Sequence, residues 1–160
     1  MSKIYVFNNA IETGLRSLII LDSVYPKLID LNKIMYYDYL MIHSGDVKDG
    51  PPSIHPATPN RTGEILVKRK IVEEGIILFI KKGLIEKVFT SHGIDYRVSD
   101  NASVFLDILE EKYTTKLKDR ASWVISEFSE YSNEKLHNYM KNNLDKWGGE
   151  FIYYDIGEVK

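Results

Sequence analysis

The chain has 160 residues, and its 21 Lys and Arg residues against 23 Asp and Glu residues give a formal net charge of −2. This near-balance argues against a dedicated polyanion-binding domain, because such a domain is usually basic throughout. Cysteine is absent, which excludes disulfides and a thiolate nucleophile, and no apolar run reaches the roughly 18 residues of a membrane span. We therefore expect one globular, soluble, cytoplasmic domain that does not enter a membrane.

The first half of the chain shows the pattern of three helices. Residues 3–7 are extended and apolar and predict a short strand. Apolar residues at three- and four-residue spacing predict helices over 10–25, 31–43 and 64–82. Asn8 and Asn9 are both suited to cap the first helix and Asp30 the second, and Gly83 is suited to end the third.

The second half begins with a hairpin pattern. Residues 84–90 and 94–98 are strand-like and are joined by the turn 91–93. Helical patterns follow over 102–109, 113–128 and 133–147, the first capped by Ser99 or Asp100 and the last by Ser132. Residues 151–156 are apolar enough for a strand that pairs with residues 3–7.

Three helices, a two-stranded hairpin and further helices follow one another in the order of a winged-helix protein with a helical extension. We predict a mainly α fold of the α+β class. Its winged-helix-like core would occupy residues 1–100, with the β-hairpin as the wing. A C-terminal helical extension and a short tail would occupy residues 101–160, and the whole would form a single compact unit.

The connection between the second and third predicted helices differs from the rest of the chain. Residues 45–62 hold four of the five prolines and few large apolar residues. A loop of this length inside a compact domain is usually functional or disordered. Because prolines stiffen the backbone, we predict an ordered, shaped loop.

The same stretch concentrates titratable side chains. They are His43, Asp46, Asp49, His55, Arg61 and Glu64. Imidazole and carboxylate groups bind Zn, Mn or Fe, so one hypothesis is a metal-dependent hydrolase that uses His43, Asp46 and His55. Their spacing matches no established ligand motif. The alternative, which we favour, is that His43 ends a helix and His55 packs between Ile54 and Pro56, with no metal or other cofactor.

The motifs of nucleotide binding and nucleophilic catalysis are absent from the sequence. It contains neither a Gly-x-Ser-x-Gly elbow nor a glycine-rich phosphate loop. We therefore expect a protein that is not an enzyme.

Nucleic-acid binding is the main alternative function, because the third helix of a winged helix usually enters the major groove. This helix and the wing carry six basic residues: Lys68, Arg69, Lys70, Lys81, Lys82 and Lys87. Four acidic residues lie in the same stretch, and Glu73 and Glu74 have the wrong sign to meet phosphates. The apolar residues of the helix also cover more than one face, which favours a protein-binding winged helix over a DNA-binding one.

Two stretches of the chain resemble a known family. They are Phe7–Asp22 (FNNAIETGLRSLIILD) and Asp30–Glu86, and they resemble the small middle component of bacterial ABC-three-component systems, the type called middle component 2. The most specific part runs from His43 to Glu64. It reads His-Ser-x-Asp, then Gly-Pro-x-Ser-Ile-His-Pro, then Pro-x-Arg-x-Gly-Glu. The tail from residue 148 onward departs from the family pattern.

The resemblance implies an antiviral defence system, related to Lamassu-type defence. In such systems an ABC ATPase of the SMC or Rad50 type senses invasion, and a separate effector subunit, often a nuclease, responds. The middle component joins these two partners, which are encoded nearby, and is not itself known to be catalytic. The chain is therefore expected to be a non-enzymatic adaptor, and the resemblance leaves open whether DNA is contacted through the complex. The winged-helix DNA-binding protein or regulator remains the alternative.

On this reading, residues 43–64 are expected to contact a larger partner. Arg61 would make a bidentate contact with a partner carboxylate. His55 and Ile54, clamped between prolines, would form a stiff protrusion that loses little entropy on docking. The full set of expected partner-binding residues is His43, Asp46, Pro51, Pro52, Ile54, His55, Pro56, Arg61 and Glu64.

Two further expectations concern charged residues on the first two helices. Glu12 and Arg16 lie one turn apart and predict an i,i+4 ion pair. Asp38 lies among three tyrosines, so we expect its carboxylate to be buried and to accept hydrogen bonds.

Overall fold

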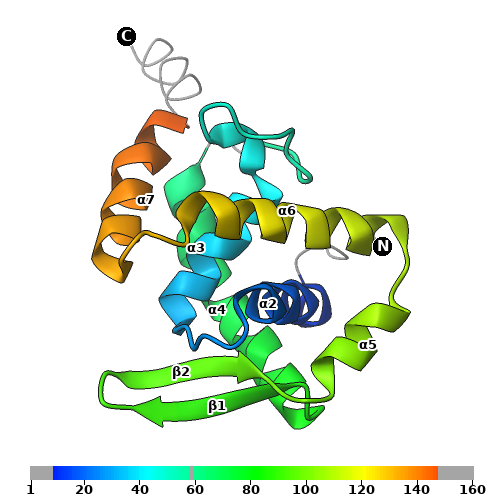
Figure 1. Ribbon diagram of the computed structural model, residues 1–160. Coiled ribbons are helices and arrows are strands. Elements are labelled where there is room, and N and C mark those ends of the chain that lie inside the picture. Colours follow the sequence, from blue (N-terminus) through cyan, green and yellow to red (C-terminus); the bar gives the residue numbers. More distant parts are fainter. Residues whose placement is uncertain (1–8, 58–59, 148–160) are drawn as a thin grey trace, which may run out of the picture.

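The computed structural model describes residues 9–57 and 60–147 of the chain. Its elements are α2 (Ala10–Val24), α3 (Leu31–Ile42), the short 3₁₀ helix η1 (Ser44–Asp46), α4 (Arg61–Lys81), β1 (Ile85–Thr90), β2 (Gly93–Val98), α5 (Ala102–Ile108), α6 (Lys112–Phe128) and α7 (Asn133–Trp147). Figure 1 shows the hairpin at one end and α6 lying across α2 and α3. The strands predicted at 3–7 and 151–156 lie outside the described residues.

Side-chain caps explain where several helices begin. Asn9, Asp30 and Ser132 accept hydrogen bonds from the backbone N–H three residues further on, at 2.8, 2.9 and 3.1 Å, as the sequence predicts. Asn60 makes the same bond at 2.8 Å to the N–H of Gly63. Because Asn60 is the cap, α4 begins three residues earlier than the predicted start at residue 64.

The predicted cap of α5 is wrong. This helix follows Asn101, whose side chain makes no capping bond. The hydroxyl of Ser99 instead donates to the carbonyl oxygen of Gly83 at 2.7 Å. Ser99 therefore ties the end of the hairpin to the end of α4.

The hairpin is confirmed and forms a two-stranded antiparallel sheet. Ile85 pairs with Val98 at its base, and Thr90 pairs with Gly93 at its turn. Gly83 and Gly93 adopt positive φ angles of 75° and 129°, which glycine reaches without a steric penalty. An isolated bridge joins β2 to Ile29, between α2 and α3, so the hairpin is fixed to the first two helices.

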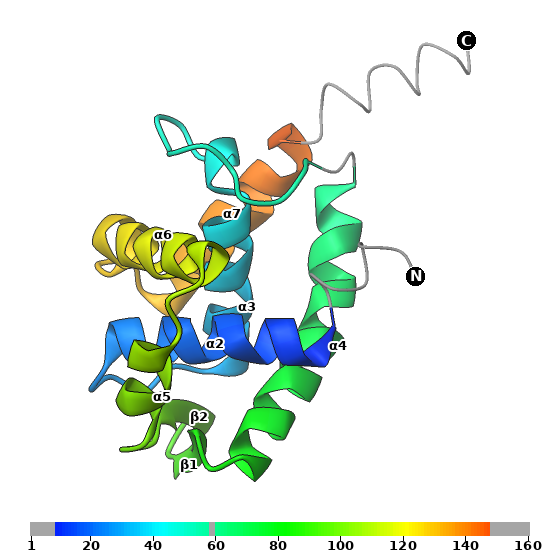
Figure 2. The same ribbon diagram turned by 90° about the vertical axis from the view of Figure 1, so that its right-hand side faces the viewer.

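Helices α2 and α4 cross with their backbones in contact (Figure 2). A Cβ atom added to Gly75 would lie 2.6 Å from the backbone nitrogen of Gly14. A Cβ atom on Gly14 would lie 2.7 Å from the carbonyl oxygen of Gly75. Only glycine at both positions allows this approach, which brings the inner face of α4 close to α2 and α3.

The core lies mainly on α2 and α3. Fully buried side chains on these helices include Leu18, Leu21, Ile34, Leu40 and Met41. Helix α6 packs on both α2 and α3, and α7 packs on α3 and α4. Burial of this apolar surface is the main force that holds the helices together.

The aromatic residues of the last two helices pack on one another. The ring of Phe128 lies 5.1 Å from that of Tyr131 and 5.2 Å from that of Tyr139. Trp147 stacks on Tyr39 of α3, with ring centroids 5.9 Å apart. These aromatics join α6 and α7 to α3.

Candidate functional site

The described part of the proline-rich loop, residues 45–57, folds back onto the end of α3. The backbone N–H groups of Ile54 and His55 both donate to the carbonyl oxygen of Ile42, at 2.9 and 3.0 Å. The carbonyl oxygen of Pro52 accepts from Ser44 Oγ at 3.1 Å and from Arg120 of α6 at 2.9 Å. This part of the loop is thus tied to two helices, and over residues 45–57 it agrees with the ordered loop that the sequence predicts.

Arg61 forms its bidentate contact within the chain. Its Nη2 and Nε atoms donate to the two oxygens of Asp46, at 3.1 and 3.3 Å. The hydroxyl of Tyr39 donates to the same carboxylate at 2.7 Å. The bidentate contact expected with a partner carboxylate is thus made within the chain, because the carboxylate belongs to η1 and the Arg61 side chain is only 4% exposed. Burial lowers the pKa of Arg61, but the hydrogen bond and the charge of Asp46, together with Tyr39, outweigh burial and raise the pKa above its usual value.

His43 caps the end of α3 and points toward the start of α4. Its Nε2 atom lies 2.7 Å from Oε2 of Glu64. Its ring lies 4.8 Å from that of Tyr39, and the residue is buried. His43 and Glu64 therefore join the end of α3 to the start of α4, on the inner side of the loop.

A second buried ion-pair group lies deeper, where α2, α3 and α4 meet. Arg16 Nε donates to Asp38 Oδ1 at 2.6 Å, and Lys68 Nζ donates to Asp38 Oδ2 at 2.8 Å. Asp38 is fully buried, as the sequence predicts. Burial raises the pKa of the Asp38 carboxyl, but the two cations outweigh that effect and hold the pKa well below its usual range.

This group corrects two sequence-based expectations. Lys68 is buried and bonded to Asp38, so its ammonium is not presented to a nucleic acid. Arg16 directs its guanidinium to Asp38 rather than forming the predicted ion pair with Glu12. Within the described residues, Oε2 of Glu12 is buried without a hydrogen-bond partner, and burial raises the pKa of this carboxyl.

His55 connects the loop to the buried charges. Its Nε2 atom lies 2.7 Å from the hydroxyl of Tyr113, and the two rings stack with centroids 6.2 Å apart. Burial lowers the pKa of His55 to about 4, and the positive charges of Arg16 and Lys68 contribute to this shift. The ring is therefore neutral at pH 7 and serves as a packed hydrogen-bonding group.

These contacts decide what the arrangement can do chemically. The buried and half-buried charged groups near the loop are already paired within the chain: Arg16 and Lys68 with Asp38, Arg61 with Asp46, and Glu64 with His43. Among residues 9–57 and 60–147, no group of three or more His, Asp or Glu side chains is placed to hold a metal ion. The side chains of the hydrolase hypothesis, His43, Asp46 and His55, instead bind Glu64, Arg61 and Tyr113.

The outer side of the loop carries the remaining expected contact residues. Pro52 and Pro56 are exposed, as are Ser53 and Ala57, whereas Pro51 is half-buried. Ile54 is also half-buried and packs against the core. We call the exposed residues Pro52, Ser53, Pro56 and Ala57 the loop crest.

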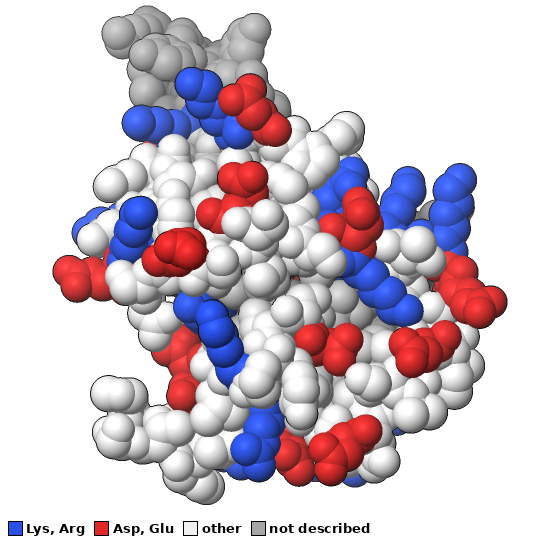
Figure 3. Space-filling model, viewed as in Figure 1, with Lys and Arg blue, Asp and Glu red and all other residues white. Residues whose placement is uncertain are grey.

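The other basic residues of the predicted nucleic-acid set are exposed. They are Arg69, Lys70, Lys81, Lys82 and Lys87. The guanidinium of Arg69 donates to the side chain of Asn32, and Glu73, Glu74 and Glu86 are exposed among these residues. The opposite face, which carries α6, shows Lys and Arg side chains interspersed with Asp and Glu (Figure 3).

Sequence reasoning missed the partners of the loop residues. Tyr39, Tyr113 and Arg120 complete the contacts, and only their polar character on otherwise apolar helix faces could have indicated them.

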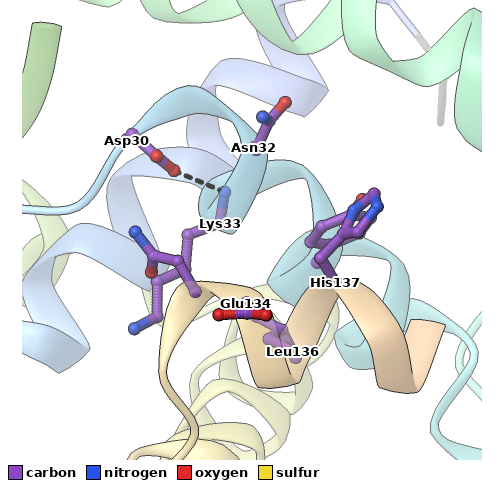
Figure 4. Close-up of a pocket in the computed structure, with 8 residues that line it drawn as sticks. Asp30, Asn32, Lys33, Glu134, Leu136 and His137 are labelled. Carbon is purple, nitrogen blue, oxygen red and sulfur yellow. Dashed lines mark hydrogen bonds between the residues drawn. The ribbon is translucent and has the colours of Figure 1, made fainter. Parts of the chain in front are cut away.

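Sequence reasoning also missed a shallow hollow of about 250 Å³ between the starts of α3 and α7. Figure 4 shows it lined by polar side chains, including Lys33, Glu134 and His137. The ring of His137 is held there by the hydroxyl of Tyr36 at 2.6 Å.

The fold and the braced loop define a small, mainly helical protein whose longest connection is fixed by buried ion pairs. The chain matches the family model of ABC-three component (ABC-3C) system Middle Component 2 over residues 6–150, and it belongs to that family. The resemblance found in the sequence is thus confirmed at the level of the family. No curated protein and no solved structure matches the chain. In the part of the chain that the structure describes, no helix is long and apolar enough to cross a membrane.

Proposed function

We propose that this chain is a non-enzymatic adaptor of an antiviral defence complex. It would bridge an SMC- or Rad50-like ABC ATPase and an effector subunit, often a nuclease, in the cytoplasm. The family match supports this role, because a middle component is by name one part of a system of several components. The sequence resemblance extends the proposal to a relation with Lamassu-type defence.

The observation that carries the proposal is the way the loop is held. Its inner side is fixed by the Arg61–Asp46 ion pair, by His55 against Tyr113, and by Arg120 on the carbonyl oxygen of Pro52. Its crest is exposed and contains two prolines. A segment that is already rigid loses little conformational entropy on binding, which favours a contact surface over a mobile connection.

The test uses the tagged full-length chain, expressed together with the ATPase and effector subunits that are encoded by the neighbouring genes. Pro56→Glu with Ala57→Glu places two charges on the crest without touching the buried ion pairs. The matched control is Asn138→Glu with Asn142→Glu, at two exposed positions one turn apart on α7. We expect the crest variant to lose at least one subunit on co-purification and the control to retain both.

Retention of both subunits by the crest variant would remove the loop from the interface. Failure of the unchanged chain to retain either subunit would contradict the adaptor role itself. Circular dichroism of each variant verifies that the helices remain folded.

A second candidate is a DNA-binding winged helix. The hairpin that follows α4, the bridge from Ile29 to β2 and the exposed basic residues of α4 and β1 favour it. The buried position of Lys68 and the neighbouring Glu73 and Glu74 count against it. The test is a salt titration of binding to duplex DNA with Lys81→Glu, Lys82→Glu and Lys87→Glu combined. A DNA-binding role requires affinity that falls steeply with salt and is lost in this variant.

A further inference from the structure

The outer face of α4 carries a regular stripe of exposed residues. The inner face is buried, through Ile65, Lys68, Val72, Ile76 and Phe79 among others. On the opposite side, Leu66, Lys70, Glu73 and Ile77 follow one another at spacings of four, three and four residues, which places them along one line of the helix. Leu66 is 70% exposed and Ile77 is 46% exposed. Figure 2 shows α4 along one edge of the molecule, with α2, α3 and α7 all on its inner side.

The stripe on one α4 helix is complementary to the same stripe on a second, antiparallel α4 helix. The midpoint between Leu66 and Ile77 coincides with the midpoint between Lys70 and Glu73, and both fall between Ile71 and Val72. A second α4 placed antiparallel about that midpoint would set Leu66 against Ile77 of the partner subunit. It would also set Lys70 against Glu73 of the partner subunit. By symmetry each contact occurs twice.

We propose that two copies of this chain associate through the outer faces of their α4 helices, antiparallel and related by a two-fold axis near Ile71 and Val72. The alternation of spacings of three and four is the pattern by which two helices pack side by side. The apolar residues lie at the two ends of the contact and the opposite charges at its centre. Val67, 64% exposed, flanks the stripe and adds apolar surface.

The charges decide the direction of the pairing. In a parallel pair in register, Lys70 would face a second Lys70 and Glu73 a second Glu73, so like charges would repel. The antiparallel pair replaces both repulsions with attractions. Among the described residues, neither Lys70 nor Glu73 has an ion-pair partner within the chain, so both are available for this contact.

The size of the face sets the expected strength. A helix of 21 residues is about 32 Å long, and one helix pair buries less surface than a standard stable interface. We therefore expect a reversible dimer that dissociates in the micromolar range rather than a permanent one. This inference is independent of the adaptor role, because it concerns the isolated chain.

The first test measures the mass of the purified full-length chain by sedimentation equilibrium from about 1 to about 300 μM. Lys70→Glu alone and Glu73→Lys alone should each weaken the dimer about tenfold or more, because each creates like-charge contacts. The double variant Lys70→Glu/Glu73→Lys should restore the dimer, because it exchanges the two signs. Lys82→Glu is the matched control, since it reverses one charge at the residue that follows the last residue of α4, outside the stripe.

Two results of this test would overturn the proposal. One is a monomer throughout the concentration range, which would mean that the outer face of α4 does not bind a second copy. The other is a dimer that Lys70→Glu and Lys82→Glu affect equally.

The second test determines the register. The chain has no cysteine, so introduced cysteines are the sole thiols. Leu66→Cys chains mixed with Ile77→Cys chains should form a disulfide between unlike chains under mild oxidation. Either variant alone should not, because its two thiols would lie on the order of 16 Å apart along the helix, beyond disulfide reach. Cross-linking of Leu66→Cys chains with one another would exclude the antiparallel arrangement.

Discussion

The two faces of α4 use the same residue types for different purposes. Lys68, on the inner face, is 6% exposed and donates to Asp38 at 2.8 Å. Lys70 lies two residues further along, on the outer face, and is exposed. Position relative to the crossing of α2 and α4, rather than residue type, therefore decides whether a charge holds the fold together or remains available for another molecule.

The inner face explains how the loop can be rigid without a large apolar core of its own. Arg16, Lys68 and Asp38 join three helices at one point, and His55 of the loop lies beside them. Removing one member of such a buried group leaves the others unpaired in a low-dielectric environment, which is costly. Charges on the outer face remain hydrated, and their removal should change stability little.

The largest expected effect follows from removing the central carboxylate. Asp38→Ala leaves two buried cations without their acceptor, so we expect a loss of about 3–5 kcal/mol in the free energy of unfolding. Asp107→Ala, which removes an exposed carboxylate from α5, is the control and should change this free energy by less than about 0.5 kcal/mol. Urea denaturation measures both. A loss below about 1 kcal/mol for Asp38→Ala would show that the group contributes little to stability.

A smaller effect is expected on replacing one of the two cations. Lys68→Met keeps an apolar side chain of similar length but removes the hydrogen bond from Lys68 to Asp38. Asp38 still accepts its hydrogen bond from Arg16. We expect a loss of about 1–3 kcal/mol, the range for a hydrogen bond to a charged group. Lys70→Met is the matched variant on the outer face and should leave the free energy of unfolding nearly unchanged when both variants are measured at a concentration at which the proposed dimer is dissociated. Equal losses in the two variants would contradict the distinction between the faces.

The position of His55 makes stability depend on pH. Its pKa is lowered to about 4 in the folded protein from its usual value of 6.5, first by burial and then by the nearby cations, with Asp38 acting in the opposite direction. Between these two values the unfolded state binds more protons, so stability rises with pH and is lost as pH falls. The contribution of His55 is at most about 1.4 kcal/mol per pH unit.

The measurement is urea denaturation at pH 7.0, 6.0 and 5.0. His55→Gln should lose less stability over this range than the unchanged chain. His92→Gln, at the exposed turn of the hairpin, should behave like the unchanged chain. Parallel pH curves for the unchanged chain and His55→Gln would show that His55 does not titrate in this way.

The sequence predicts the elements far better than the contacts between them. Periodicity and caps such as Asn9, Asp30 and Ser132 are local signals, and they place the helices and the hairpin within a few residues. The ion pairs join residues that lie 22 and 30 positions apart, and no local pattern specifies such pairs. Arg61 shows the consequence, because its bidentate chemistry could be predicted whereas the identity of its carboxylate could not.

The smallest expected effect on stability comes from an exposed ion pair whose N–O distance matches that of a buried one. Arg97 Nε lies 2.8 Å from Glu86 Oε1 across the hairpin, nearly the same distance as Lys68 from Asp38, but both side chains are 48% exposed. Water and salt screen this pair, so Arg97→Ala should cost less than about 0.5 kcal/mol. A double-mutant cycle with Glu86→Ala at low and high salt measures the coupling. A coupling above about 1 kcal/mol that persists at high salt would mean that distance, and not burial, governs the strength of ion pairs in this protein.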